Sequence, residues 1–133
     1  VCQQVSDYFG SEGALLAAED IGYDAGMLPY SEGVAGLMER YYAQKWYEAD
    51  VRSERGFAIA RRQGWVTDYT IMQEAELREH RFYNELVRPA GLSWFAATAV
   101  KVGSRVWGLS VQRTAQQGPF QRNELLQLSG LRG

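Results

Sequence analysis

The clearest hydrophobic pattern in the chain lies in residues 92–113, where two apolar runs flank Gly103-Ser104. A two-residue Gly-X connection between apolar runs is typical of a type II′ β-hairpin. With that turn Val102 pairs with Arg105, and strand alternation assigns the remaining side chains to two faces. One face carries most of the bulk, in the pairs Val100–Trp107, Thr98–Leu109, Ala96–Val111 and Trp94–Arg113. The other face is small near its middle, in the pairs Lys101–Val106, Ala99–Gly108, Ala97–Ser110 and Phe95–Gln112. This small face leaves room either for a closely packed helix or for a ligand.

Apolar residues at three- and four-residue steps predict helices elsewhere in the chain. The predicted segments are 1–9, 32–49, 74–87 and 120–128. The second of these follows Ser31, a candidate N-cap, and is the clearest amphipathic helix. The third breaks at His80-Arg81, which predicts two short helices or one kinked helix that ends at Arg88-Pro89.

The remaining segments are predicted to be strands and loops. Residues 14–18 are expected to form a buried strand, and residues 64–68 a short strand or an extended edge. Residues 19–30 are acidic and contain Gly and Pro, which favours a loop. Residues 50–63 are rich in charges of both signs, and we expect a solvated, mobile loop there. A further loop is expected at residues 115–119.

Composition narrows the class of protein. The 133 residues are 46% hydrophobic, which fits one globular domain over residues 1–133. The net charge of −2 comes without a basic stripe, which argues against nucleic-acid binding by this segment itself. A single cysteine, Cys2, suits a reducing compartment, and no apolar run is long enough to span a membrane. Because the chain begins at Val1 and ends within a pattern, we expect a fragment of a longer cytoplasmic protein.

Residues 82–92, FYNELVRPAGL, resemble the FYxDFLRPxGL signature of the N-terminal sensory domain of LuxR-type bacterial transcription regulators. The similarity extends, in the same order, to residues 41–50, to the hairpin after Leu92 and to Gly118-Pro119-Phe120 before the last helix. The resemblance implies an α/β (α+β), GAF/PAS-like fold with a central antiparallel sheet and helices on both sides. It also implies a small-molecule cavity on one face of the sheet and the terminal helices on the other.

The resemblance implies a division of labour between this chain and the rest of the regulator. The terminal helices are expected to form a homodimer interface and to pass a signal onward. DNA would be bound only by a C-terminal helix-turn-helix domain that lies outside this chain. No membrane partner and no cofactor are expected.

Aromatic and small side chains are the candidates for a ligand pocket, because such pockets are mostly apolar with a few placed polar groups. We predict pocket positions from the crossover segments and from the small face of the hairpin: Tyr42, Trp46, Trp65, Tyr69, Tyr83, Phe95, Ala97 and Ala99. The alternative is that most of these side chains simply fill the core. Asp68 is a further candidate for accepting a hydrogen bond from a ligand, and its alternative is a turn residue.

Catalysis is not expected. His80 is the only histidine, and Glu76, one helical turn before it, is placed to raise its pKa. No nucleophile motif, metal-ligand spacing or phosphate-binding loop accompanies it. Arg88 is expected to favour a helix C-terminus, Cys2 to be a small buried residue, and the middle-loop arginines to be solvated: Arg52, Arg55, Arg61 and Arg62.

The sequence therefore predicts a ligand-sensing domain of a LuxR-type regulator, with an unknown small molecule as ligand and no catalytic or metal site. The alternative from another class is a ligand-free dimerisation or interaction module, in which a helix fills the small face of the hairpin. A small enzyme is the third hypothesis and would need convergent titratable groups.

Overall fold

The computed structural model describes residues 1–19 and 29–131, which form an α+β fold around one antiparallel sheet. The strands, in the spatial order β1-β4-β3-β2, are β1 (Gly13–Ala18), β2 (Val66–Thr67), β3 (Trp94–Val102) and β4 (Arg105–Arg113). The helices are α1 (Cys2–Tyr8), η2 (Glu32–Val34), α2 (Ala35–Ala43), η3 (Trp46–Ala49), α3 (Val51–Gln63), α4 (Asp68–Ile71), α5 (Glu74–Glu79), η4 (Phe82–Val87) and α6 (Arg122–Gly130). The fold class predicted from the sequence is confirmed. The predicted loop at 19–30 lies mostly outside the described residues.

The β3–β4 hairpin has the predicted register throughout, from Val102 opposite Arg105 to Trp94 opposite Arg113. Gly103 has a φ of 63°, and Ser104 does not share a positive φ, as a type II′ turn requires. β1 pairs with β4, and the two-residue β2 pairs with β3 at the sheet edge, so these two strand predictions are also confirmed. Local turn chemistry therefore fixes which side chains share a face.

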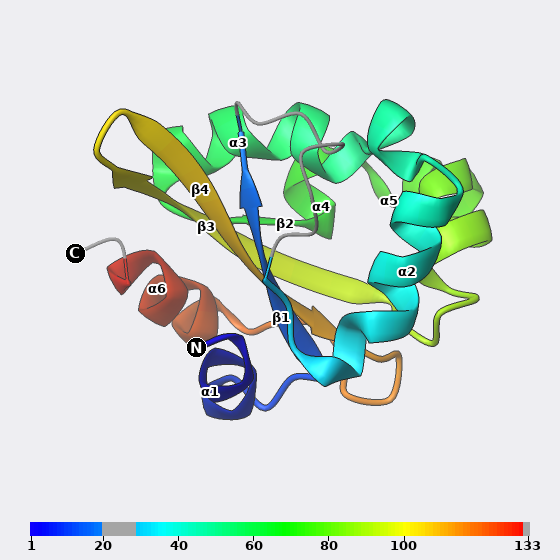
Figure 1. The fold of residues 1–133 in the computed structure, drawn as a ribbon, viewed down its shortest axis with the longest axis horizontal. Helices are drawn as coiled ribbons and strands as arrows, with labels where there is room; N and C mark the ends of the chain where they lie inside the picture. The colour runs from blue at the N-terminus through cyan, green and yellow to red at the C-terminus, as the bar shows by residue number, and fades with distance from the viewer. Residues whose placement is uncertain (20–28, 132–133) are drawn as a thin grey trace.

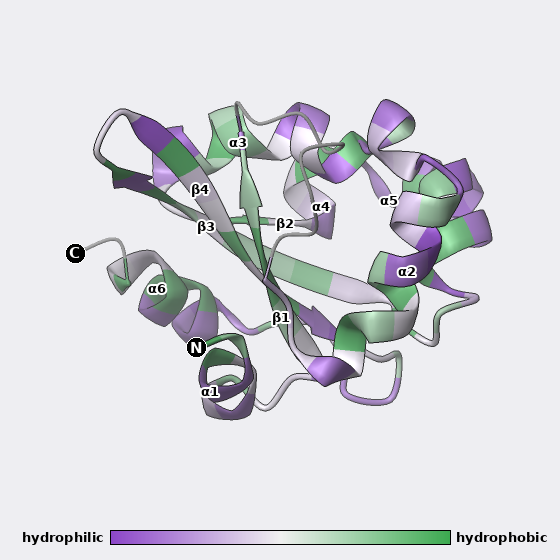
Figure 2. Ribbon diagram, viewed as in Figure 1, coloured by the Kyte–Doolittle hydropathy of each residue, from purple (hydrophilic) through white to green (hydrophobic). Residues whose placement is uncertain are grey.

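The two faces of the sheet are covered by different helices (Figure 1). α1 and α6 lie together against one face, where they form the terminal-helix cluster: Cys2, Phe9, Ala14, Ala96, Val111, Leu125 and Leu128. The main core lies on the other face and gathers residues from α2, α3, α5, η4 and β3. In Figure 2, β1 is hydrophobic along its length, whereas α1 and α6 alternate between hydrophilic and hydrophobic residues, as helices with one buried face do.

The predicted helix at 32–49 is wrong as one continuous element. The chain forms η2, α2 and η3 instead, and Lys45 interrupts the helical path with a left-handed φ of 57°. Ser31 does not cap the helix with its side chain; its Oγ accepts a hydrogen bond from the backbone N–H of Ala14 at 2.9 Å. This contact ties the start of η2 to β1.

The predicted mobile loop at 50–63 is wrong, because most of this segment is the 13-residue helix α3. Asp50 caps it by accepting the backbone N–H of Ser53 at 3.0 Å, and Gly64 ends it with a φ of 96°. Its charges lie largely on the outer surface, where Arg55 pairs with Glu76 and Arg61 with Glu19. Arg52 is the exception, because its side chain is only 9% exposed.

The break predicted at His80-Arg81 is confirmed, since α5 ends at Glu79 and η4, a π-helix, begins at Phe82. Arg88 keeps a helical conformation before Pro89, and Gly91, with a φ of 83°, leads into the hairpin. α1 and α6 confirm the predicted terminal helices, and Gln121 and Glu124 form a capping box at the start of α6.

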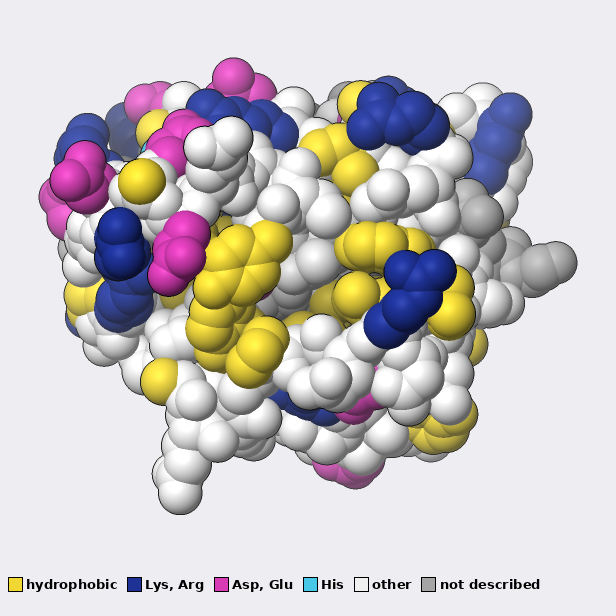
Figure 3. All heavy atoms as spheres, turned by 180° about the vertical axis from the view of Figure 1, so that it is seen from behind, with side chains coloured by type: hydrophobic (Ala, Val, Ile, Leu, Met, Phe, Trp, Pro, Cys, Tyr) yellow, Lys and Arg dark blue, Asp and Glu magenta, His cyan; other side chains and the backbone are white. Residues whose placement is uncertain are grey.

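The surface mixes apolar and charged side chains. On the face seen from behind, hydrophobic side chains gather in the middle, and charged side chains lie along the upper and left edges and in a few places between the hydrophobic ones (Figure 3). Within the described residues, no helix combines the length and the apolar character that a membrane crossing needs.

Candidate functional site

A cavity of about 100 Å³ lies between the small face of the hairpin and the helices that cover it. Its apolar walls come from β1, α2, α3, β2 and η4, and include Leu15, Leu37, Met38, Phe57, Val66 and Leu86. Its polar lining is concentrated in Tyr42, Asp50, Arg52, Ser53, Ser110 and Gln112. The helices that cover the small face of the hairpin therefore do not fill it completely, and a hollow remains between them and the sheet.

Small residues of the hairpin form the sheet side of this cavity. Ala97, Ala99, Gly108 and Ser110 all line it. At Gly108 a Cβ would press against the ring of Phe57, whose nearest atom lies 3.2 Å from the ideal Cβ position, so the ring would have to move by a few tenths of an ångström. The small residues thus allow α3 to approach the sheet closely and still leave a hollow beside it.

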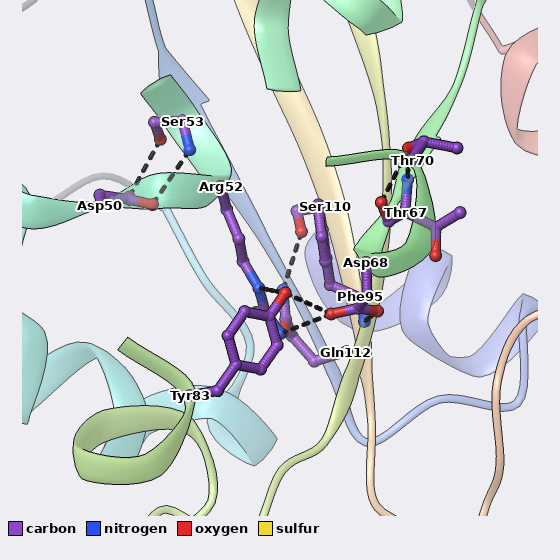
Figure 4. A network of polar contacts seen from close by, with 10 residues as sticks. All are labelled: Asp50, Arg52, Ser53, Thr67, Asp68, Thr70, Tyr83, Phe95, Ser110 and Gln112. Atoms are coloured by element: carbon purple, nitrogen blue, oxygen red, sulfur yellow. Dashed lines mark hydrogen bonds and ion pairs between the residues drawn. The ribbon is translucent and has the colours of Figure 1, made fainter. Parts of the chain in front are cut away.

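A buried polar network borders the cavity, which Arg52, Phe95 and Gln112 of this network line (Figure 4). Arg52 of α3 donates to the hydroxyl of Tyr83 at 3.1 Å, to Gln112 Oε1 at 2.8 Å and to Asp68 Oδ1 at 3.3 Å. The hydroxyl of Tyr83 and the backbone N–H of Phe95 also donate to Asp68. The guanidinium of Arg52 lies 4.3 Å from the ring centroid of Phe95, in cation–π geometry. The network joins α3, α4, η4, β3 and β4.

Burial raises the pKa of both acidic groups of this network, Asp68 and Tyr83. It raises the pKa of Asp68 above its usual range, although the charge of Arg52 and the hydrogen bonds from Tyr83 and from the N–H of Phe95 act in the opposite direction. Burial likewise raises the pKa of Tyr83, so its hydroxyl stays protonated and donates. The pKa of Arg52 is raised although burial opposes it, because the charge of Asp68 and the hydrogen bond to the Tyr83 hydroxyl favour the cation. Arg52 is therefore a permanent buried cation.

The network also orients Ser110, which lines the cavity. Because a guanidinium can only donate, Gln112 must present its oxygen to Arg52 and its amide nitrogen elsewhere. That nitrogen donates to Ser110 Oγ at 2.8 Å. The hydrogen of the Ser110 hydroxyl therefore points away from Gln112. The hydroxyl of Tyr42 is buried and, among the described residues, has no hydrogen-bond partner. Both hydroxyls can donate to a molecule in the cavity.

Asp50 occupies the start of α3 beside the cavity. Its carboxylate accepts from the hydroxyl of Tyr41 at 2.7 Å and from the N–H and hydroxyl of Ser53, both at 3.0 Å. The carboxylate thus holds the helix N-terminus in place and is itself held by three donors.

Four of the eight predicted pocket residues line the cavity and four do not. Tyr42, Phe95, Ala97 and Ala99 line the cavity. Trp46 and Tyr83 lie outside the lining: the ring of Trp46 packs 6.0 Å from that of Phe82, and Tyr83 belongs to the buried network.

Trp65 and Tyr69 do not line the cavity. Trp65 packs against the terminal-helix cluster on the opposite face of the sheet. Tyr69 is 52% exposed, and its ring lies 5.5 Å from that of Trp94. Both were predicted to line the pocket because they belong to the crossover segment. The local sequence of such a segment does not show on which side of the sheet an aromatic ring will lie.

The other candidate residues have structural partners. Asp68 is fully buried and is the first residue of α4, so it is a helix residue and not the turn residue considered as its alternative. His80 Nδ1 accepts the backbone N–H of Phe82 at 3.1 Å, and Glu76 pairs with Arg55. Arg88 donates to Asn84. Cys2 is buried, which raises the pKa of its thiol. The described residues contain no cluster of three or more acidic, cysteine or histidine side chains suited to a metal.

A second buried arginine lies on the opposite face of the sheet. Arg113, next to Gln112 on β4, donates to the carboxylate of Glu124 in α6, to the carbonyl of Phe9 after α1 and to that of Pro119. Its guanidinium also lies 4.1 Å from the ring centroid of Phe120. We call these contacts the Arg113 clamp. It connects both terminal helices to the strand that carries Ser110 and Gln112.

Comparison with known proteins identifies a fold. No protein-family model and no curated protein matches the chain. The fold is similar to that of a solved structure of SdiA, a LuxR-type regulator, in complex with octanoyl-rac-glycerol, with a TM-score of 0.64 and 15% sequence identity. The similarity covers 96% of this chain and 52% of the SdiA chain, so the chain spans about half of that protein. At this identity the likeness establishes a shared fold.

Proposed function

We propose that this chain is the GAF/PAS-like ligand-sensing domain of a cytoplasmic LuxR-type transcription regulator, and that it is not an enzyme. The observation that carries the proposal is the cavity on one face of the sheet with the two terminal helices on the other. The fold shared with SdiA and the signature-like run at residues 82–92 support it.

The lining indicates the chemistry of the ligand. Most of the walls are apolar, which suits an aliphatic or aromatic body. The hydroxyls of Tyr42 and Ser110 are placed to donate, so the ligand would supply acceptor oxygens at its polar end. The SdiA ligand, octanoyl-rac-glycerol, has this chemistry, with an acyl chain and an ester group. We therefore expect a small amphiphile with carbonyl or ester oxygens.

The terminal helices are the proposed output. A ligand shifts a conformational equilibrium only by binding one arrangement more tightly than another. β4 is the structural link, because Ser110 and Gln112 face the cavity and the adjacent Arg113 clamps α1 and α6. A shift of β4 on ligand binding would thus change how the helices are held, and a DNA-binding domain beyond this chain would respond.

Native mass spectrometry of the purified protein tests this function. We expect a reproducible mass above that of the denatured chain, which identification of the released compound would assign to a small amphiphile. The same measurement on Ala97→Leu, which fills the cavity, is expected to lose the extra mass. The matched control is Ala96→Leu, because Ala96 is the neighbouring residue on β3 and faces the terminal helices. An extra mass that persists in Ala97→Leu places the ligand elsewhere.

A homodimer through α1 and α6 is the second candidate, as the sole role or beside ligand sensing. Tyr8, Leu126 and Leu131, on or next to the terminal helices, are 69%, 53% and 48% exposed. Large apolar side chains that stay exposed on neighbouring helices favour a partner surface. Light scattering of the parent and of Leu126→Glu tests this, with a dimer expected for the parent and a monomer for the variant. A dimer without any ligand would favour the interaction module.

A further inference from the structure

A second hollow lies next to the cavity. An outer groove of about 400 Å³ lies on the surface beside α3, lined by residues that include Tyr47, Glu48, Glu54 and Ala58. The cavity and the outer groove have three lining residues in common, Asp50, Ser53 and Phe57. These three side chains therefore form the wall between the two hollows.

Two of the three wall residues are fixed in place. Asp50 accepts three hydrogen bonds, two of them from Ser53, and so holds the first turn of α3. The side chain of Phe57 carries no group that can form such hydrogen bonds. It is half-buried and belongs to neither hydrophobic cluster of the described residues. Its ring lies over Gly108, where the absence of a side chain makes room for it.

The helix beside Phe57 is weakened. Gly56 precedes it in the interior of α3, and glycine disfavours the helical conformation relative to alanine. Packing does not require this glycine, because a Cβ there would meet only Val66, at the ordinary contact distance of 3.7 Å. The ring of Phe57 thus lies on a locally pliable part of the helix.

The volumes of the cavity and of the outer groove indicate that a ligand would need both spaces. At about 100 Å³ the cavity is small for a site that holds a whole ligand, since such sites span roughly 300–1,000 Å³. The cavity joined to the outer groove of about 400 Å³ falls within that range. Rotation of one side chain, Phe57, would join them.

We propose that Phe57 is a movable wall of the ligand site, which continues past it into the outer groove, so that Phe57 sets the longest apolar ligand that the domain holds. The inference rests on the proposed function and adds to it a residue that determines specificity. A ligand short enough for the cavity leaves the ring over Gly108. A longer ligand displaces the ring and extends along α3.

Calorimetric titration with a series of 1-monoacylglycerols, from butanoyl to dodecanoyl and each below its micelle concentration, tests the proposal. A buried methylene contributes about fourfold in affinity. We expect this increase in the parent up to one chain length and a plateau beyond it. In Phe57→Ala the increase continues past that length, and in Phe57→Trp the plateau begins at a shorter chain. Phe57→Leu, which keeps an apolar side chain, replaces Phe57→Ala if that variant does not fold.

The matched control is Phe120→Ala, which removes another half-buried ring on the opposite side of the sheet and is expected to keep the plateau of the parent. The same plateau in the parent and in both Phe57→Ala and Phe57→Leu overturns the movable wall and leaves the sensing function intact. Binding of no member by the parent but of some by Phe57→Ala supports the wall. Binding of none by either protein overturns the ligand class and the wall together.

Discussion

Two buried arginines occupy opposite faces of the same sheet, and their surroundings differ. Arg52, on the cavity face, bonds three side chains that come from α4, η4 and β4. Arg113, on the helix face, bonds one carboxylate and two backbone carbonyls. The carboxylate partner of Arg52 is fully buried, whereas the side chain of Glu124 is 20% exposed. The pKa values of the two carboxyl groups are shifted in opposite directions, upward for Asp68 and downward for Glu124.

The opposite pKa shifts of Asp68 and Glu124 mean that the two ion pairs affect stability differently. Burial raises the pKa of Asp68, so its ionised form is held at a cost in stability. Burial also acts to raise the pKa of Glu124, but the hydrogen bonds from Arg113 and from the N–H of Gln121 outweigh it and lower that pKa, so ionised Glu124 stabilises the fold. A costly buried pair beside a cavity is typical of functional sites. The Arg113 clamp stabilises the packing of the terminal helices.

The largest expected effect is at Arg52. Arg52→Met leaves Asp68 buried without its cation, and we expect a loss of about 3–5 kcal/mol in the free energy of unfolding at pH 7. Arg113→Met should cost less, about 1–3 kcal/mol, because water reaches Glu124. Urea denaturation of the two variants measures both. Equal losses would remove the proposed distinction between the two pairs.

The pH dependence of the same variant sharpens this test. A carboxyl group whose pKa is raised in the folded state binds its proton more tightly there, so lowering the pH stabilises the folded form. The charge of Arg52 acts to lower the pKa of Asp68, so removing it raises this pKa further in Arg52→Met than in the parent. The deficit of Arg52→Met is therefore expected to shrink as the pH falls from 7 toward 5 and Asp68 of the variant takes up a proton. A loss of unfolding free energy that stays the same from pH 7 to pH 5 would mean that the Asp68 carboxylate is stabilised in the variant by something other than proton uptake.

The next effect compares adjacent residues of β3. Ala96 is fully buried under the terminal helices, and Ala96→Leu is expected to overpack this face at a cost of about 1–3 kcal/mol. Ala97 lines the cavity, so Ala97→Leu should change stability by less than about 1 kcal/mol. Thermal unfolding followed by circular dichroism measures both. Similar losses would mean that the cavity face is as tightly packed as the helix face.

The smallest effect is at Glu124. Because its folded pKa is lowered, its ionised form contributes stability above the ordinary pKa of about 4.5, and this stability is lost as the pH falls through the lower folded value. Glu124→Gln is expected to cost about 1–2 kcal/mol at pH 7 and progressively less below pH 4.5. Unfolding of parent and variant across this range checks the sign. A difference in unfolding free energy between parent and variant that does not change with pH would mean that the charge of Glu124 does not stabilise the Arg113 clamp.

Sequence patterns predicted what depends on neighbouring residues. The hairpin register follows from a two-residue turn with glycine at its first position, and Val102–Arg105 through Trp94–Arg113 pair as predicted. The same alternation separated Ala97 from Ala96 and so placed the cavity-lining residues of β3. Local signals also marked the break at His80-Arg81.

The prediction was wrong where charge was taken for exposure. α3 begins after Asp50 and ends at Gly64, both ordinary helix-boundary signals, yet its charges led to the loop assignment. The network of Arg52 was missed for a different reason. Its partners Asp68, Tyr83 and Gln112 lie 16, 31 and 60 residues away, so only the folded chain brings them together. No local pattern distinguishes Arg52 from the exposed arginines of the same helix.

The two-residue turn at Gly103-Ser104 restricts how the length of this protein can vary. Inserting or deleting a single residue there would shift the pairing by one position and exchange the two faces of a strand. Arg113 would then project into the cavity and Gln112 under the terminal helices, although both lie at the far end of the hairpin. Related sequences are therefore expected to tolerate substitutions at the hairpin tip but not changes in its length.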